Sequence, residues 1–125
     1  MIEYRRIDLE GVRYYGKHLI LTAAACNGNL VDKAKVASFM TELVKRIDMT
    51  AFGDPIVERF GQGQEIGISA VQLIETSAIV IHTNDQARDM YLDVFSCKTF
   101  SEHDVISYVK EYYQPQHLNY QVIMR

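Results

Sequence analysis

The chain has few of the residues that mark disulfide-linked, metal-binding or membrane-spanning proteins. Its 125 residues include two cysteines, Cys26 and Cys97, and neither stands in a Cys-x-x-Cys or Cys/His pattern. Because this spacing indicates neither a disulfide framework nor a zinc site, we expect free thiols and no metal. No apolar run approaches the roughly 20 residues that a helix needs to cross a bilayer.

The chain also lacks a strong excess of positive or negative charge. The 16 acidic and 13 basic side chains leave a formal net charge of −3, and no basic run is present. This balance predicts neither a nucleic-acid partner nor a membrane surface as a partner. Residues 1–8 are charged and lack the apolar core of a secretory signal, which predicts a cytoplasmic protein.

The chain does have enough apolar side chains for one core. Hydrophobic residues make up 48% of its 125 residues, which predicts a single small domain over residues 1–125. Apolar residues recur at helical spacing in two stretches, 31–47 and 105–113. Asp32, or Asn29 before it, is expected to cap the first helix, and Ser101 the second.

Short stretches with the pattern of β-strands fill most of the remaining sequence. Two of them are expected to form a hairpin that turns at Glu75-Thr76-Ser77. The order of strand, helix, several antiparallel strands, helix and strand predicts an α+β two-layer sandwich, in which two helices cover one face of an antiparallel sheet. The expected strands are residues 18–25, 56–60, 66–74, 78–83, 90–95 and 118–124.

Four polar residues lie near the ends of the middle strands: Ser69, Ser77, His82 and Cys97. Each has an ordinary structural explanation when it is taken singly. A serine is common in hairpin turns, a histidine on an apolar strand is usually hydrogen-bonded in the core, and a cysteine at a strand end is usually a small buried apolar group. Their combination and spacing are more informative.

Residues 67–83 resemble, without a gap, the central block of the bacterial and archaeal S-adenosylmethionine decarboxylase family. That block has a Gly-Val-Ser start, a Glu-Ser-His cleavage site and an Ile-His-Thr end, and this chain has Gly67-Ile68-Ser69, Glu75-Thr76-Ser77 and Ile81-His82-Thr83. Residues 92–97 are similar to the family's Asp-Leu-Phe-Thr-Cys segment, and residues 15–19 to its Gly-Arg/Lys-His-Leu opening. The resemblance therefore covers nearly the whole chain.

The resemblance implies that Ser77 is the precursor of a pyruvoyl group, which forms a Schiff base with the substrate amine and takes up electrons as carbon dioxide leaves. Self-cleavage between Thr76 and Ser77 would give a β chain, residues 1–76, and an α chain, residues 77–125. The resemblance also implies that the processed unit assembles as a homodimer.

Other roles follow from the same resemblance, position by position. His82 would be the proton acceptor in processing, with Ser69 assisting it. Cys97 would return a proton to the decarboxylated carbon. Phe60 and Glu75 would contact the substrate.

The chain departs from the family pattern at several places, and two of them bear most on function. Thr76 stands where the family has the glutamate before the cleavage serine, and Asn84-Asp85-Gln86 replaces Trp-Pro-Glu. Three hypotheses follow. The first is a decarboxylase of S-adenosylmethionine in spermidine and polyamine synthesis. The second is an unprocessed homologue that acts as a binding or regulatory subunit, and the third is a pyruvoyl decarboxylase of arginine or ornithine.

Overall fold

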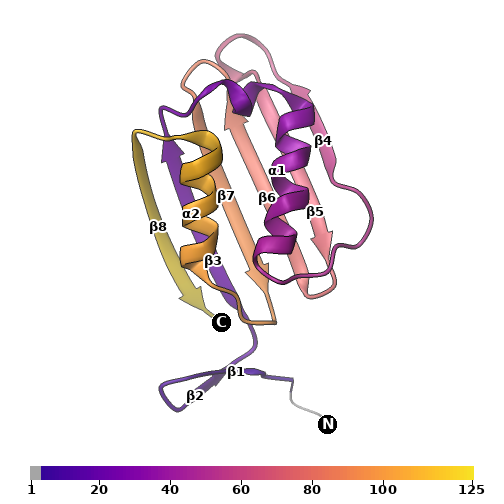
Figure 1. Ribbon diagram of the computed structural model, residues 1–125, viewed down its shortest axis with the longest axis vertical. Coiled ribbons are helices and arrows are strands. Elements are labelled where there is room, and N and C mark those ends of the chain that lie inside the picture. The colour runs from indigo at the N-terminus through magenta and orange to yellow at the C-terminus, as the bar shows by residue number, and fades with distance from the viewer. Residues whose placement is uncertain (1–3) are drawn as a thin grey trace.

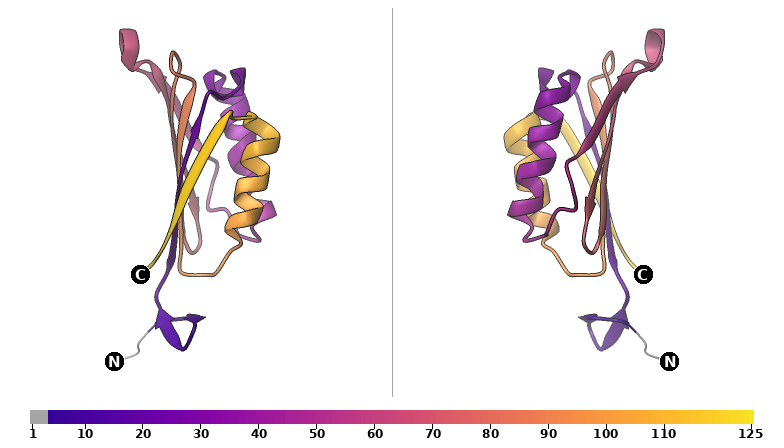
Figure 2. Two further views of the ribbon diagram at one scale, coloured as in Figure 1. Left: turned by 90° about the vertical axis from the view of Figure 1, so that its left-hand side faces the viewer. Right: turned by 90° about the vertical axis from the view of Figure 1, so that its right-hand side faces the viewer.

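The computed structural model describes residues 4–125, which form one sheet layer and one helix layer (Figure 1). Both helices lie on the same face of the sheet, and the side views show the other face without a helix over it (Figure 2). The elements, in chain order, are β1 (Ile7–Leu9), β2 (Val12–Tyr14), β3 (Lys17–Ala24), η1 (Gly28–Val31), α1 (Lys33–Arg46), β4 (Ile56–Phe60), η2 (Gly63–Glu65), β5 (Gly67–Ile74), β6 (Ser77–Asn84), β7 (Asp89–Ser96), α2 (Glu102–Tyr113) and β8 (His117–Met124).

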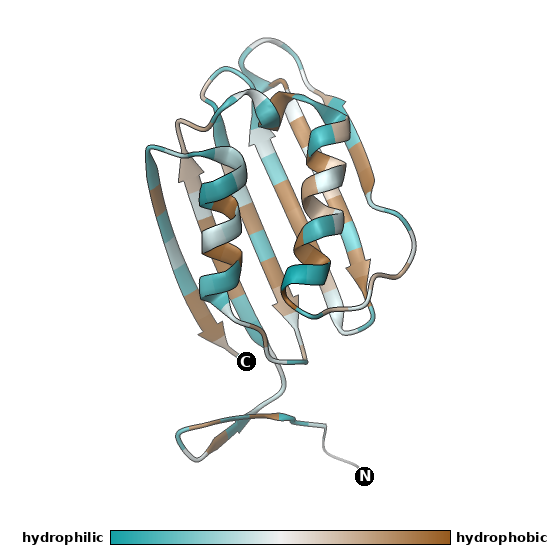
Figure 3. Cartoon of the chain, viewed as in Figure 1, coloured by the Kyte–Doolittle hydropathy of each residue, from teal (hydrophilic) through white to brown (hydrophobic). Residues whose placement is uncertain are grey.

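The main sheet has six strands in the order β4-β5-β6-β7-β3-β8, and every neighbouring pair is antiparallel. The predicted α+β two-layer sandwich is confirmed. Alternation along the strands explains how the sheet holds its helices, because successive side chains point to opposite faces. In β6, Ile79, Ile81 and Thr83 are buried under the helices, whereas Val80 and His82 lie on the other face. Figure 3 shows this alternation of hydropathy along the strands.

Side-chain caps place the starts of both helices. The Asp32 carboxylate accepts hydrogen bonds from the backbone N–H groups of Ala34 and Lys35, so α1 begins at Lys33. The helix predicted from residue 31 therefore starts two residues later, because residues 28–31 form the 3₁₀ turn η1. The Ser101 hydroxyl caps α2 in the expected way, accepting from the Asp104 N–H at 3.2 Å.

The hydrophobic core lies between the helix layer and the sheet. Its largest fully buried side chains come from both helices and from the four central strands, as the burial of Phe39, Tyr113, Ile79 and Leu92 shows. Four aromatic rings meet between α1 and α2; Phe39 stacks on Tyr108 with ring centroids 4.8 Å apart. These contacts fix the helices against each other as well as against the sheet.

The face of the sheet opposite the helices remains open and carries apolar side chains. We call it the open face. The exposed large apolar side chains of the open face are Ile56, Phe60, Leu73, Val80, Tyr91 and Ile123.

Within residues 4–125, no helix is long and apolar enough to cross a membrane.

A small hairpin precedes the main sheet and was not expected from the sequence. Strands β1 and β2 pair only with each other, and they project beyond the end of the sheet (Figures 1 and 2). The turn between them has positive φ at Glu10 and Gly11, the conformation of a tight two-residue hairpin. We call residues 4–15 the N-terminal arm.

Candidate active site

The expected cleavage bond lies in the turn between β5 and β6. Ser77 is the first residue of β6 and pairs with Ile74 and Ser96 in the ladder. Its backbone φ is +153°, in a region that residues other than glycine rarely adopt. Such a conformation costs about 1–3 kcal/mol and persists only where the surrounding structure holds it. The strained torsion is about the N–Cα bond of Ser77, directly beside the peptide bond between Thr76 and Ser77.

Thr76 is fixed by polar contacts on both its backbone and its side chain. Its carbonyl oxygen accepts a hydrogen bond of 3.0 Å from the backbone N–H of Cys97. Its hydroxyl lies 2.7 Å from the hydroxyl of Ser96, which is fully buried and also accepts from the Lys98 N–H at 3.0 Å. The threonine side chain at position 76 is thus held by the Ser96 hydroxyl.

Cys97 lies beside this turn, directly after β7. Its side chain is largely buried, with 8% of the residue exposed. The Arg6 guanidinium donates from Nη2 to the Cys97 Sγ at 3.7 Å, and the thiol donates to the Tyr4 hydroxyl oxygen at 4.0 Å. The Cys97 backbone contacts the carbonyl of the cleavage bond, so its thiol lies in the same region, and a thiol can exchange a proton. We call Thr76, Ser77 and Cys97 the turn group.

Ser69 and His82 form a second polar pair, on the open face. They lie opposite each other in the β5–β6 ladder, and the Ser69 Oγ is 2.9 Å from the His82 Nδ1. The His82 ring stacks on Tyr91, with centroids 6.4 Å apart and planes 25° apart. These contacts orient the imidazole, and its Nε2 has no hydrogen-bond partner among residues 4–125. We call Ser69 and His82 the serine–histidine pair.

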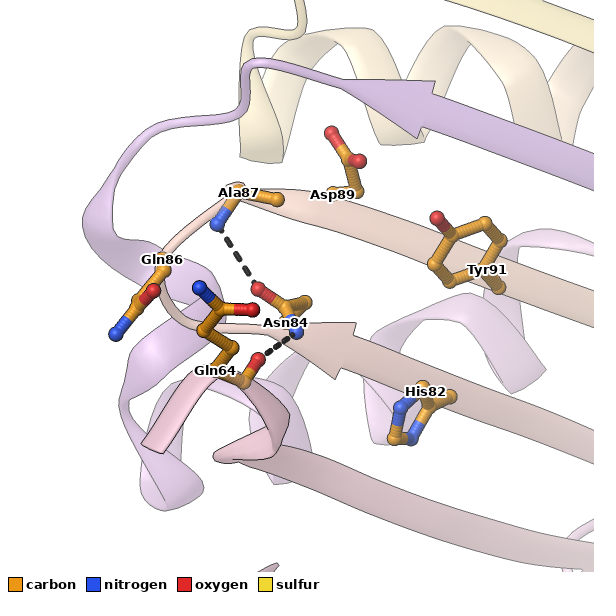
Figure 4. A pocket seen from close by; sticks show the side chains of 7 residues that line it. All are labelled: Gln64, His82, Asn84, Gln86, Ala87, Asp89 and Tyr91. Atoms are coloured by element: carbon orange, nitrogen blue, oxygen red, sulfur yellow. Dashed lines mark hydrogen bonds between the residues drawn. The ribbon is translucent and has the colours of Figure 1, made fainter. Parts of the chain in front are cut away.

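A cavity of about 520 Å³ adjoins the serine–histidine pair (Figure 4). Asn84 shapes its rim, because its side chain donates to the Gln64 carbonyl at 2.8 Å and accepts from the Ala87 N–H at 2.9 Å. Asp85, the next residue, pairs with Arg59 on β4. The cavity is lined by Gln64, His82, Asn84, Gln86, Ala87, Asp89 and Tyr91.

Gly67 lets the strands close at this end of the sheet. A Cβ at Gly67 would lie 1.8 Å from the carbonyl oxygen of Thr83, so another residue here would push β5 away from β6. The glycine at the start of the Gly67-Ile68-Ser69 segment is therefore explained by backbone contact with the strand that carries His82.

The structure brings the four expected polar residues together as two pairs, not as one cluster. Ser77 and Cys97 both lie at the turn, where the Cys97 N–H contacts Thr76 and Ser77 lies opposite Ser96, whereas Ser69 and His82 contact each other further along β5 and β6. His82 follows Ser77 by five residues of the same strand, which at about 3.3 Å per residue places it roughly 16 Å away. One chain alone therefore does not bring His82 to the cleavage bond.

The two residues expected to contact the substrate also lie in different places, one at the turn and one on the open face. Glu75 is exposed in the turn, and its N–H donates to the Thr50 carbonyl at 2.9 Å. Phe60 ends β4 with 60% of the residue exposed, on the open face near the serine–histidine pair. Within residues 4–125, no group of three or more histidine, cysteine or carboxylate side chains could hold a metal ion.

Sequence reasoning missed three residues of the turn region: Ser96, Arg6 and Tyr4. Ser96 directly precedes Cys97, and its contact with Thr76 follows from the β6–β7 register. Arg6 and Tyr4 reach Cys97 from more than 90 positions away in the chain. No local pattern marks such a contact.

Comparison with known proteins agrees with this architecture. A family model described as S-adenosylmethionine decarboxylase matches residues 17–125. The S-adenosylmethionine decarboxylase proenzyme of Clostridium botulinum (strain Loch Maree / Type A3) is 28% identical over 101 residues, covering 80% of this chain and 84% of that protein. The proenzyme of Methanococcus maripaludis (strain C5) is 27% identical over 116 residues, covering 91% and 92%.

A solved structure shows the same fold. The adenosylmethionine decarboxylase from Aquifex aeolicus VF5 superimposes with a TM-score of 0.76 at 20% identity, covering 90% of this chain and 91% of that one. Because the family model spans nearly the whole chain, this protein belongs to the S-adenosylmethionine decarboxylase family of carboxy-lyases.

Proposed function

We propose that this protein decarboxylates S-adenosylmethionine with a pyruvoyl group that it makes from Ser77. The observation that carries the proposal is the geometry at the turn. Ser77 has a strained backbone, and the carbonyl before it is fixed by the Cys97 N–H at 3.0 Å. Within residues 4–125 the Ser77 hydroxyl has no hydrogen-bond partner, so no contact has to break before it reacts.

Cleavage then follows from groups that are already in place. The Ser77 hydroxyl attacks the Thr76 carbonyl carbon, the peptide C–N bond breaks, and the freed amine takes the hydroxyl proton, which leaves an ester. The Cys97 N–H points at the oxygen on which negative charge develops during this attack. Relief of the backbone strain at Ser77 favours the same step.

Elimination completes the cleavage. A base takes the Cα proton of Ser77, the Cβ–O bond breaks, and residues 1–76 leave with a terminal carboxylate. Water then hydrolyses the unsaturated residue and releases ammonia, so that residues 77–125 begin with a pyruvoyl group. His82 suits the role of the base, since imidazole accepts a proton near neutral pH and its Nδ1 is fixed by Ser69.

In the decarboxylation itself, the pyruvoyl ketone supplies the sink for the electrons left by carbon dioxide. The Cys97 thiol holds the proton that replaces the lost carboxylate. Its largely buried position beside the turn keeps bulk water from competing for that step.

We infer that the working unit is a homodimer packed through the open face. The serine–histidine pair lies on this face and far from the turn group of its own chain, so a second copy has to supply it. Two sheets packed face to face lie about 10 Å apart, within reach of side chains from both. The exposed apolar residues of the open face, such as Val80 and Leu73, would be buried in this arrangement.

The substrate follows from the relatives, which are named S-adenosylmethionine decarboxylase proenzymes. These names favour the first hypothesis over an uncleaved regulatory subunit or a decarboxylase of arginine or ornithine. A role in spermidine and polyamine synthesis is part of this proposal. We further propose a cytoplasmic location, in keeping with the free thiols of Cys26 and Cys97.

Release of labelled carbon dioxide tests the substrate. The purified protein should release it from carboxyl-labelled S-adenosylmethionine and not from labelled arginine or ornithine. The Cys97→Ser variant should remain cleaved but lose most of this release. Release from arginine or ornithine alone would overturn the choice of substrate. The cavity lined by the amide side chains of Gln64, Asn84 and Gln86 would then bind a different amino acid.

A further inference from the structure

The N-terminal arm, residues 4–15, precedes the part of the chain that matches the family model. It is nevertheless anchored to the body of the protein. Ile7 is buried, with 7% of the residue exposed, and its neighbours include Lys17 and Val122 around a shared cavity. The arm leaves the sheet at Gly16, whose backbone exchanges two hydrogen bonds with Arg125 at 3.0 and 2.8 Å. These contacts keep the arm at the end of the sheet that carries Cys97.

A series of aromatic contacts links β7 to the part of the arm that contacts the Cys97 thiol. Tyr15 stacks on Phe95 of β7 with centroids 6.4 Å apart, and the Tyr4 ring meets Tyr15 edge-on at 5.9 Å. The guanidinium carbon of Arg6 lies 4.9 Å from the centre of the Tyr4 ring. Gly16 permits this approach, since a Cβ there would be 2.7 Å from the Phe95 ring.

Arg6 therefore holds its charge next to Cys97, with Nη2 3.7 Å from Sγ. The ion pairs within residues 4–125 give Arg6 no carboxylate partner, whereas Lys17 is paired with Glu102 and Lys98 with Asp48. A guanidinium that is exposed, stacked on a ring and without a carboxylate is suited to bind one from a ligand, because its fork matches the two carboxylate oxygens.

We propose that Arg6 binds the α-carboxylate of the amino-acid substrate. The inference rests on the proposed function, in which Cys97 protonates the carbon that loses this carboxylate. The carboxylate and the Cys97 Sγ must then approach the same carbon atom, and Arg6 is within hydrogen-bond reach of that sulfur. The arm thus adds a substrate contact that the matched part of the chain does not contain.

Kinetics give the first test. Arg6→Ala should raise the KM for the amino acid that the enzyme decarboxylates by roughly 10- to 100-fold, the range expected for a charge-assisted hydrogen bond. Its kcat should not fall, because the contact is made to the ground state and is lost as carbon dioxide leaves. Arg6→Lys should recover part of the KM. The matched control is Arg13→Ala on the same arm, which should keep the wild-type KM.

Alkylation of Cys97 gives a second test that needs no turnover. All three proteins carry Ser77→Ala, so that none can decarboxylate the substrate. S-adenosylmethionine should then slow the reaction of Cys97 with iodoacetamide in the protein with the wild-type arm and in Arg13→Ala, but not in Arg6→Ala. Its decarboxylated form lacks the carboxylate and should protect all three proteins equally. Peptide mass spectrometry reads the modification. Cys26 is the internal reference, because burial raises the pKa of its thiol to about 11 and so makes it slow to react.

The two tests separate the inference from the proposed function. An uncleaved, inactive wild-type protein would contradict the proposed function, and the alkylation comparison would still decide the role of Arg6. A cleaved and active Arg6→Ala with unchanged KM, equal protection in Arg6→Ala and the protein with the wild-type arm, or no protection with the wild-type arm would each overturn the inference.

Discussion

The backbone N–H of Cys97 donates a hydrogen bond of 3.0 Å to the carbonyl oxygen of Thr76. The residue proposed to protonate the product therefore also supports the bond proposed to break during maturation. Both roles depend on the β6–β7 register, in which Ser77 lies opposite Ser96. Substitutions at these paired residues should therefore slow cleavage even where the fold is kept.

Ser96→Ala tests how far the side chain of Thr76 matters for cleavage. The change removes the hydroxyl that lies 2.7 Å from the Thr76 hydroxyl but leaves the backbone contact with Cys97. The Lys98 N–H loses its acceptor as well. We expect cleavage to slow by roughly tenfold or more, because each lost hydrogen bond contributes about 1 kcal/mol, in a time course of freshly synthesised protein on denaturing gels. Ser107→Ala, at an exposed position on α2, is the matched control and should cleave at the wild-type rate.

A mixed dimer tests whether the serine–histidine pair acts on the partner chain. Ser77→Ala and His82→Ala chains, each with its own tag, should remain uncut when expressed alone. Expressed together, the His82→Ala chain should be cut, because the Ser77→Ala partner supplies an intact His82. Complete cleavage of His82→Ala expressed alone would show that His82 is not the base.

Tyr113→Phe is expected to stabilise the protein. The Tyr113 hydroxyl is buried and finds no hydrogen-bond partner among residues 4–125, and burial strongly raises its pKa. Because a buried, unpaired hydroxyl costs about 1 kcal/mol or more, its removal should raise the free energy of unfolding by about 1 kcal/mol. Urea denaturation in an uncut Ser77→Ala background measures this, and a loss of stability would reveal a partner for the hydroxyl.

The Lys17–Glu102 pair should make stability depend on acid pH. The hydrogen bond from the Lys17 ammonium is the main reason that the pKa of Glu102 lies below its usual value of 4.5. A carboxylate with a lowered folded-state pKa stabilises the protein above its unfolded pKa, and this contribution disappears as the pH falls through the lowered value. Glu102→Gln should therefore cost about 1 kcal/mol at pH 7 and less at pH 3.

The comparison for Glu102→Gln uses urea denaturation at both pH values, again with Ser77→Ala present in both proteins. Glu111→Gln is the control, because Glu111 pairs with Arg46 in a more exposed position and should cost less at pH 7. An equal loss at pH 7 and pH 3 would mean that the Glu102 charge is not the source of the effect.

Much of the fold could be predicted from periodicity. The helix stripes and the alternation in β5, β6 and β7 are long enough to show which face of each element is buried. The β1–β2 hairpin was missed because each strand has three residues, too few for a pattern. The arm's contacts with Cys97 join residues far apart in the chain, and no local signal reports them.

The candidate site could be predicted in part. The resemblance to the family singled out Ser69, Ser77, His82 and Cys97, but it does not show which of them lie in contact. The strained φ of Ser77 depends on how the turn closes against β7, so the residue types around it give no sign of it. The separation of His82 from Ser77 follows once both are placed on one strand, because five residues of strand span roughly 16 Å.

Intact-mass spectrometry of the purified protein shows whether the chain cuts itself before Ser77. We expect two chains, residues 1–76 ending in the Thr76 carboxylate and residues 77–125 beginning with a pyruvoyl group, and a single uncut chain for Ser77→Ala. A single mass for the full wild-type chain under conditions that permit processing would contradict this expectation.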